Sequence, residues 1–121
     1  MSAAIWIGVA GLGGLGTVAR FALDRFVLAR AGRGFPAGTL AVNVSGSFLL
    51  GLLVGVSLEG DAYLLAGTAV LGSYTTFSTW MLETQRLGEN GEGTGLVANI
   101  ALSAAIGLGA AVLGRLIGAA L

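Results

Sequence analysis

The sequence predicts an all-α integral membrane protein with four transmembrane helices, the third of which is broken near its centre. Composition gives the first reason: 55% of the 121 residues are hydrophobic and 10% are charged, whereas a soluble domain carries about 25% charged residues. The mean hydropathy is +0.91. Second, the apolar residues form four segments, each close to the roughly 20 residues that a membrane span needs. Third, hydroxyl-bearing residues interrupt the third segment where a helix centre would lie.

The predicted spans follow one another with short connections. The first runs from about residue 3 to 28 and lacks a positively charged start, which favours a transmembrane helix over a cleaved signal peptide. The second runs from 39 to 58, after a turn that contains Pro36, the third from 62 to about 82, and the fourth from 96 to 121. Because no connection is large enough to form another domain, residues 1–121 are predicted to be one four-helix transmembrane domain.

The 22 glycines of the chain indicate close helix packing. In membranes, small residues let helix backbones approach each other, and this packing replaces the missing hydrophobic driving force. Gly51 and Gly55 in the second span, and Gly114 and Gly118 in the fourth, have the spacing of such contacts. Because four helices alone enclose little volume, we expect the chain to associate with a second copy.

The third span contains the most informative stretch. Residues 72–80 read Gly-Ser-Tyr-Thr-Thr-Phe-Ser-Thr-Trp and follow an apolar run. Glycine, serine and β-branched threonine are poor residues for a helix centre. Irregular backbone at membrane depth is tolerated only beside a cavity or another protein surface, and transport proteins use such breaks to hold ions. The stretch therefore predicts an ion pathway.

Two further features within the spans suit a small anion. Asn43 shares a helix face with Thr39, Gly46 and Ser47, and its amide offers two donors and one acceptor. Such an amide either joins helices or donates to an anion that is losing its water. Phe77 and Trp80 are three residues apart, so their rings project from one face, where the positive ring edges can contact an anion. Ordinary packing is the alternative for both features.

Polar residues also mark the other two spans. Asn99, Ser103 and Gly107 form a thin stripe along the fourth span. Arg20 lies near the end of the first span, with Asp24 one helical turn further on. Arg20 either extends toward water with Asp24 as its partner or draws anions into a vestibule. The residues alone do not decide between these two roles.

Composition argues against several functional classes. Cysteine, histidine and lysine are absent, which removes thiol chemistry and the usual bases, metal ligands and amine nucleophiles of enzymes. An enzyme is therefore not expected. The zero net charge gives no basic face for nucleic acid. The GxGxxG pattern at residues 11–16 has no preceding strand and no acid about 20 residues further on, so a dinucleotide site is rejected.

Over its whole length the sequence resembles the Fluc/CrcB fluoride channels. Three motifs carry the resemblance in order, at residues 13–21, 39–51 and 72–79. Members of that family form antiparallel, dual-topology dimers that conduct fluoride through two pores. The resemblance implies a homodimer of this kind in the lipid bilayer of a prokaryotic inner (plasma) membrane. It also implies passive export of cytoplasmic fluoride, which reduces fluoride toxicity.

The resemblance assigns roles by position. The backbone carbonyls of Gly72 and Thr75 would hold a structural sodium ion (Na+) that is not transported. Arg20 would lie at the wide mouth of the pore and Glu83 near the end of a vestibule. The chain departs from the family pattern at Trp80, where a second phenylalanine is usual, and at Ser73, where glycine is usual. The fluoride path would be lined by Thr39, Asn43, Thr76, Phe77, Ser78, Trp80 and Ser103.

Two other functions remain to be compared with a channel. A small four-span multidrug or cation antiporter needs a titratable group inside a span, but the second and fourth spans have no acid and the first has only Asp24 near its end. A non-conducting membrane subunit would explain the glycines but not the polar residues.

The distribution of arginines conflicts with dual topology. On one side of the membrane lie Arg25, Arg30, Arg33 and Arg86, and on the other lies Arg115, whereas a dual-topology protein should show little such bias.

Overall fold

A computed structural model describes all 121 residues, and the chain is helical with no strand. Three long helices, α1 (Ala3–Ala31), α2 (Ala37–Gly55) and α6 (Gly93–Ala120), are long and apolar enough to cross a membrane. The remaining span is divided. It begins with α3 (Gly60–Tyr63), η1 (Leu64–Leu71) and α4 (Gly72–Tyr74), and resumes after a break as α5 (Ser78–Glu89). The predicted fold class, with a broken third helix, is confirmed.

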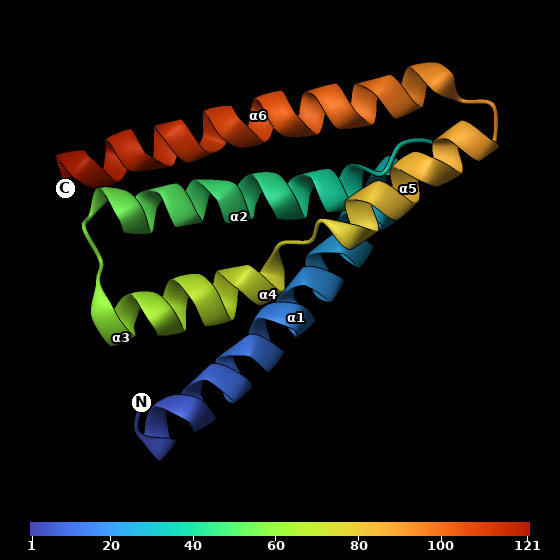
Figure 1. Ribbon diagram of the computed structural model, residues 1–121. Coiled ribbons are helices and arrows are strands. Elements are labelled where there is room, and N and C mark those ends of the chain that lie inside the picture. Colours follow the sequence, from blue (N-terminus) through green and yellow to red (C-terminus); the bar gives the residue numbers. More distant parts are fainter.

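The helices run back and forth between two ends of the molecule (Figure 1). The N-terminus, the connection from α2 to α3 and the C-terminus lie at one end. The connections from α1 to α2 and from α5 to α6 lie at the other, and α2 and α6 run side by side along the length. Successive spans therefore alternate in direction, as a chain that crosses a membrane four times requires.

The glycine spacing of α2 and α6 has the predicted consequence. A Cβ added at Gly51 would overlap the carbonyl oxygen of Ala111, and one added at Gly114 would overlap the carbonyl oxygen of Phe48. Gly55 and Gly118 likewise face each other's helix backbone. The two helices thus touch backbone to backbone, and the prediction of close glycine packing is confirmed.

The glycine-rich motif of α1 has a packing role as well. The helix runs through residues 11–16 without interruption, which agrees with the rejection of a dinucleotide loop. A Cβ at Gly16 would overlap the side-chain oxygen of Ser73 and the carbonyl oxygen of Val70. Gly16 therefore lets α1 lie directly against the segment that precedes the break.

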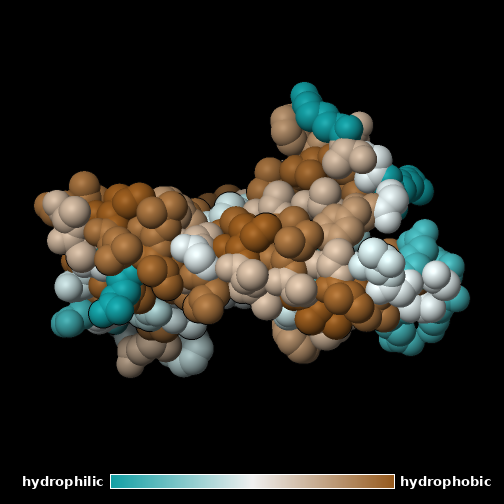
Figure 2. Space-filling view, turned by 90° about the horizontal axis from the view of Figure 1, so that it is seen from above, coloured by the Kyte–Doolittle hydropathy of each residue, from teal (hydrophilic) through white to brown (hydrophobic).

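The face of the molecule seen in Figure 2 is mostly apolar between its two ends. Figure 2 shows hydrophilic residues gathered at the ends and hydrophobic atoms along the length between them. Only 15 of the 121 residues are buried, and large apolar side chains such as Trp6, Phe21 and Leu108 are exposed. Lipid suits this surface, because apolar side chains need no hydrogen-bond partner there.

Helix limits differ from the predicted spans by a few residues. α2 ends at Gly55 rather than residue 58, because the chain turns there with a positive φ of 58° at Ser57 and 61° at Gly60. η1 is a π-helix, which the sequence did not predict. Such i→i+5 segments are rare and often lie at functional sites, and this one leads directly into the break.

Candidate functional site

The break begins at Thr75, whose backbone turns from helical to extended (φ −79°, ψ 156°). Its N–H donates to the carbonyl oxygen of Leu71 over 3.0 Å, and its Oγ1 donates to the same oxygen over 2.9 Å. A threonine side chain can close a helix in this way because its hydroxyl competes for nearby backbone groups. The helix therefore ends within the hydroxyl-bearing stretch, after Tyr74.

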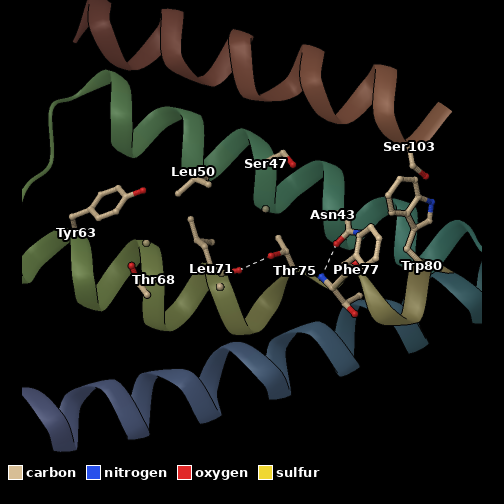
Figure 3. Close-up of a pocket in the computed structure, with 14 residues that line it drawn as sticks. Asn43, Ser47, Leu50, Tyr63, Thr68, Leu71, Thr75, Phe77, Trp80 and Ser103 are labelled. Atoms are coloured by element: carbon tan, nitrogen blue, oxygen red, sulfur yellow. Dashed lines mark hydrogen bonds between the residues drawn. The ribbon is translucent and has the colours of Figure 1, made fainter. Parts of the chain in front are cut away.

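Asn43 of α2 holds the centre of the break. Its Nδ2 donates to the carbonyl oxygen of Thr76 over 2.8 Å, and its Oδ1 accepts the Thr76 N–H over 2.8 Å (Figure 3). The Thr76 hydroxyl oxygen in turn accepts the N–H of Thr79 over 3.2 Å, which caps the start of α5. An amide carries donors and an acceptor on one planar group, so Asn43 pairs both the N–H and the carbonyl of Thr76.

The break leaves the carbonyl oxygens of residues 72–75 without their usual helical partners, and two of these carbonyls belong to the predicted sodium ligands, Gly72 and Thr75. The carbonyl of Gly72 would accept from Thr75 or Thr76, but those N–H groups donate to Leu71 and Asn43. The carbonyl of Thr75 would accept from Thr79, whose N–H donates to the Thr76 hydroxyl. A helix end also carries partial negative charge, and hard cations prefer oxygen ligands. These two carbonyls therefore fit a small cation such as sodium.

An open groove of about 510 Å³ runs along the break between α2 and the η1–α4 segment. Its lining includes Ser47 and Leu50 of α2 and Thr68 and Leu71 of η1, which Figure 3 labels. The groove also brings together most of the predicted site. The predicted residues that line it are Asn43, Gly72, Thr75, Thr76, Phe77, Trp80 and Ser103.

The two aromatic rings meet at one end of this groove. The ring centroids of Phe77 and Trp80 lie 5.8 Å apart at 83°, an edge-to-face arrangement. Phe77 is 69% exposed, so most of its side chain is uncovered within the chain. The indole Nε1 of Trp80 donates to the carbonyl oxygen of Asn99 over 3.2 Å. The rings share one side of the helix, as their spacing predicts.

The remaining predicted residues lie in or beside two further cavities. Arg20 and Thr39 line a cavity of about 250 Å³ that also reaches Thr76, so Thr76 borders both this cavity and the groove. Thr39 donates a hydrogen bond to Glu83, which lines an outer cavity of about 570 Å³. This outer cavity also contains Arg25, Arg33 and Arg86. Ser78 is exposed and lines none of the three cavities.

The alternative role of Arg20, with Asp24 as its partner, is not supported at Asp24 Oδ1. Oδ1 of Asp24 is buried and has no hydrogen-bond partner, so it does not receive a bond from Arg20. It lies against Gly38 at the start of α2 instead.

Sequence reasoning missed Thr84, and it places Asn99 only in a polar stripe. Their signal is the spacing of four residues from Trp80 to Thr84 and from Asn99 to Ser103, which puts each pair on one helix face.

Comparison with known proteins gives the family. The family model described as CrcB-like protein, Camphor Resistance (CrcB), matches residues 7–115. The Fluoride-specific ion channel FluC 2 of Mycobacterium tuberculosis (strain ATCC 25618 / H37Rv) is 56% identical over 115 residues, which cover 95% of this chain and 91% of that protein. The Fluoride-specific ion channel FluC of Deinococcus radiodurans is 42% identical over 126 aligned residues and all of both chains.

A third relative, Fluoride-specific ion channel FluC 1 of Symbiobacterium thermophilum, is 40% identical over 119 aligned positions, and the alignment covers 93% of this chain and 96% of that protein. These relatives come from bacteria, and this chain has three helices apolar enough to cross a membrane. It is a multi-pass protein of the bacterial plasma membrane. The family match over residues 7–115 and the identity of its relatives lead to one conclusion: the chain belongs to the CrcB family, whose curated members are named as ion channels and not as enzymes.

Proposed function

We propose that this chain is a fluoride channel that lets fluoride leave the cell passively. The groove beside the helix break carries the proposal, because amide, hydroxyl and aromatic groups converge there at the centre of a span. Fluoride is small and strongly hydrated, so a pore must offer donors that replace its water. Asn43 keeps one Nδ2 hydrogen for this purpose after its bond to Thr76. Binding must also remain weak enough for the ion to leave.

The order of the cavities supports a path from one end of the chain to its centre. The outer cavity is lined by three arginines and two glutamates, and its excess of positive charge attracts anions. The smaller cavity with Arg20 and Thr39 follows, and Thr76 connects it to the groove. The aromatic edges of Phe77 and Trp80, with the Ser103 hydroxyl, complete the path in this proposal.

A second copy of the chain would close the groove. Polar groups in the groove, such as Thr68 and the Asn43 amide, cannot face lipid without a cost of several kcal/mol for each unpaired group, on the order of 4–8. Phe77 is 69% exposed within one chain. In this proposal a second copy covers this face, and the family resemblance favours a homodimer in antiparallel orientation. The exposed ring would then lie at the interface between the copies.

The carbonyls of Gly72 and Thr75 support a structural sodium ion, which would bridge the two copies. Replacing sodium with N-methyl-D-glucamine throughout purification should lower the melting temperature of the dimer. It should also reduce fluoride efflux at least tenfold, which corresponds to about 1.4 kcal/mol. Dimer content on size-exclusion chromatography gives a readout that is independent of transport. An unchanged dimer and unchanged efflux after strict sodium removal would count against the site.

The mode of transport is tested in liposomes loaded with potassium fluoride. A channel moves charge, so fluoride release should begin only when a potassium ionophore provides a compensating current. In a cell, hydrogen fluoride enters as a neutral weak acid and ionises at cytoplasmic pH, and the channel would release the trapped ion. Fluoride release at full rate without the ionophore would contradict a channel and favour a proton-coupled antiporter.

A further inference from the structure

A closed set of hydrogen bonds joins α5 to α6 behind the groove. Thr84 Oγ1 donates to the carbonyl oxygen of Trp80 over 2.8 Å, and Asn99 Nδ2 donates to Thr84 Oγ1 over 2.9 Å. The indole Nε1 of Trp80 completes the set by donating to the carbonyl oxygen of Asn99 over 3.2 Å. Trp80 is thus held at two points, through its backbone carbonyl and through the nitrogen of its ring.

Thr84 and Asn99 lie outside the cavities that they support. Asn99 is 1% exposed and Thr84 is 6% exposed, and neither lines the groove or the two further cavities. Buried polar groups of this kind reduce stability unless they are paired. Asn99 therefore does not contact an ion in the groove, although its sequence position lies in the polar stripe of the fourth span.

The same asparagine reaches a second groove residue. Ser103 Oγ lies 3.4 Å from Asn99 Oδ1 and donates to it, and both Ser103 and Trp80 line the groove. The two residues come from different helices, α6 and α5. Asn99 is the one residue that hydrogen-bonds to both, so it fixes the separation between them (Figure 3 labels both).

We propose that Thr84 and Asn99 are positioning residues that fix the Trp80 indole at the side of the fluoride path, and this rests on the proposed fluoride conduction. The extra N–H that tryptophan has over phenylalanine is used by Asn99. The ring therefore presents carbon-bound hydrogens to the groove, as a phenylalanine edge would. The acceptor is the backbone carbonyl of Asn99, and the bond from Asn99 Nδ2 to Thr84 Oγ1 holds this part of α6 against α5.

The test is a Thr84→Val variant, which removes the hydroxyl at nearly constant shape. It is made in a Trp6→Phe background, so that Trp80 is the one remaining tryptophan of the two in the chain. We expect fluoride efflux to fall about tenfold, which corresponds to about 1.4 kcal/mol, and the NMR resonance of the Trp80 indole N–H to shift. Thr84→Ser should restore both properties because it keeps the hydroxyl.

Two further variants keep the test decisive. Thr94→Val changes an exposed threonine of α6 and should leave efflux and the indole resonance as they were. Asn99→Ala removes the side-chain donor to Thr84 but keeps the backbone carbonyl that accepts from the indole. It should therefore reproduce the effect of Thr84→Val and should matter less in a Trp80→Phe background.

The positioning role is overturned if both substitutions leave the indole resonance unchanged. It is also overturned if they reduce efflux by the same factor in the chain that keeps Trp80 and in the Trp80→Phe background. Absence of fluoride release from the unmodified chain would reject the channel function alone, because the indole resonance still reports on the pair.

Discussion

An Asn43→Ala variant is expected to lose at least about 99% of its fluoride efflux and to melt at a lower temperature. The substitution leaves the N–H and the carbonyl of Thr76 without their partners from α2. Each buried backbone group left unpaired costs about 1–3 kcal/mol. If the two groups together destabilise the break by about 2.8 kcal/mol, the population of chains with the break intact relative to the disrupted form falls a hundredfold. Efflux should fall with that population. Efflux from liposomes and thermal unfolding in detergent measure the two effects.

An Asn43→Asp variant separates the two roles of this side chain. A carboxylate still accepts from the Thr76 N–H but cannot donate to its carbonyl, so stability should fall less than in the alanine variant. Efflux should stay low in both variants, because a negative charge beside the groove repels an anion. Wild-type melting and wild-type efflux in Asn43→Ala would show that Asn43 does not hold the break.

A Gly114→Ala variant is expected to disrupt the packing of α2 against α6. The added methyl group would overlap the carbonyl oxygen of Phe48, which belongs to the helix backbone and cannot rotate away. Overpacking of this kind costs about 1–3 kcal/mol. Because Asn43 is on α2 and Ser103 is on α6, a wider helix separation should also lower fluoride efflux. Melting temperature and efflux are again the measurements.

Gly109 provides the matched control on the same helix. A Cβ at Gly109 meets nothing within 4 Å, so Gly109→Ala gains helix propensity, about 0.5–1 kcal/mol, without a clash. The control should therefore melt at the same temperature as the wild type or slightly higher. Equal melting temperatures for the Gly114 and Gly109 variants would contradict the backbone contact between α2 and α6.

Much of the fold could be predicted because membrane helices leave strong local signals. Apolar length identifies the spans, since each must cross about 30 Å of hydrocarbon. The spacing of Gly51 with Gly55, and of Gly114 with Gly118, predicts a helix contact without naming its partner. The break could be predicted at residues 72–80 because glycine, serine and threonine there conflict with an otherwise apolar helix.

The contacts around the break could not be predicted, because they join residues far apart in sequence. Asn43 is 33 residues from Thr76. Whether its amide donates to an ion or joins two helices depends on which residues lie next to it in the fold. In the structure the Asn43 side chain joins α2 to the backbone of Thr76. Its donation to fluoride stays a prediction. The spacing of Asn99 and Ser103 shows that they share a helix face. Spacing does not show that Asn99 on this face is buried. The π-helix η1 leaves no simple periodic signal in the residues from Leu64 to Leu71.

The release of fluoride compared with chloride from liposomes tests the central claim most directly. Purified protein is reconstituted with both anions inside, a potassium ionophore is added, and each anion is followed with its own electrode. We expect rapid fluoride release with little release of chloride, because the proposed pore would replace the water of fluoride with donors and would exclude larger anions by its width. Comparable release of both anions, or none of either from a folded protein, would contradict a fluoride-selective channel.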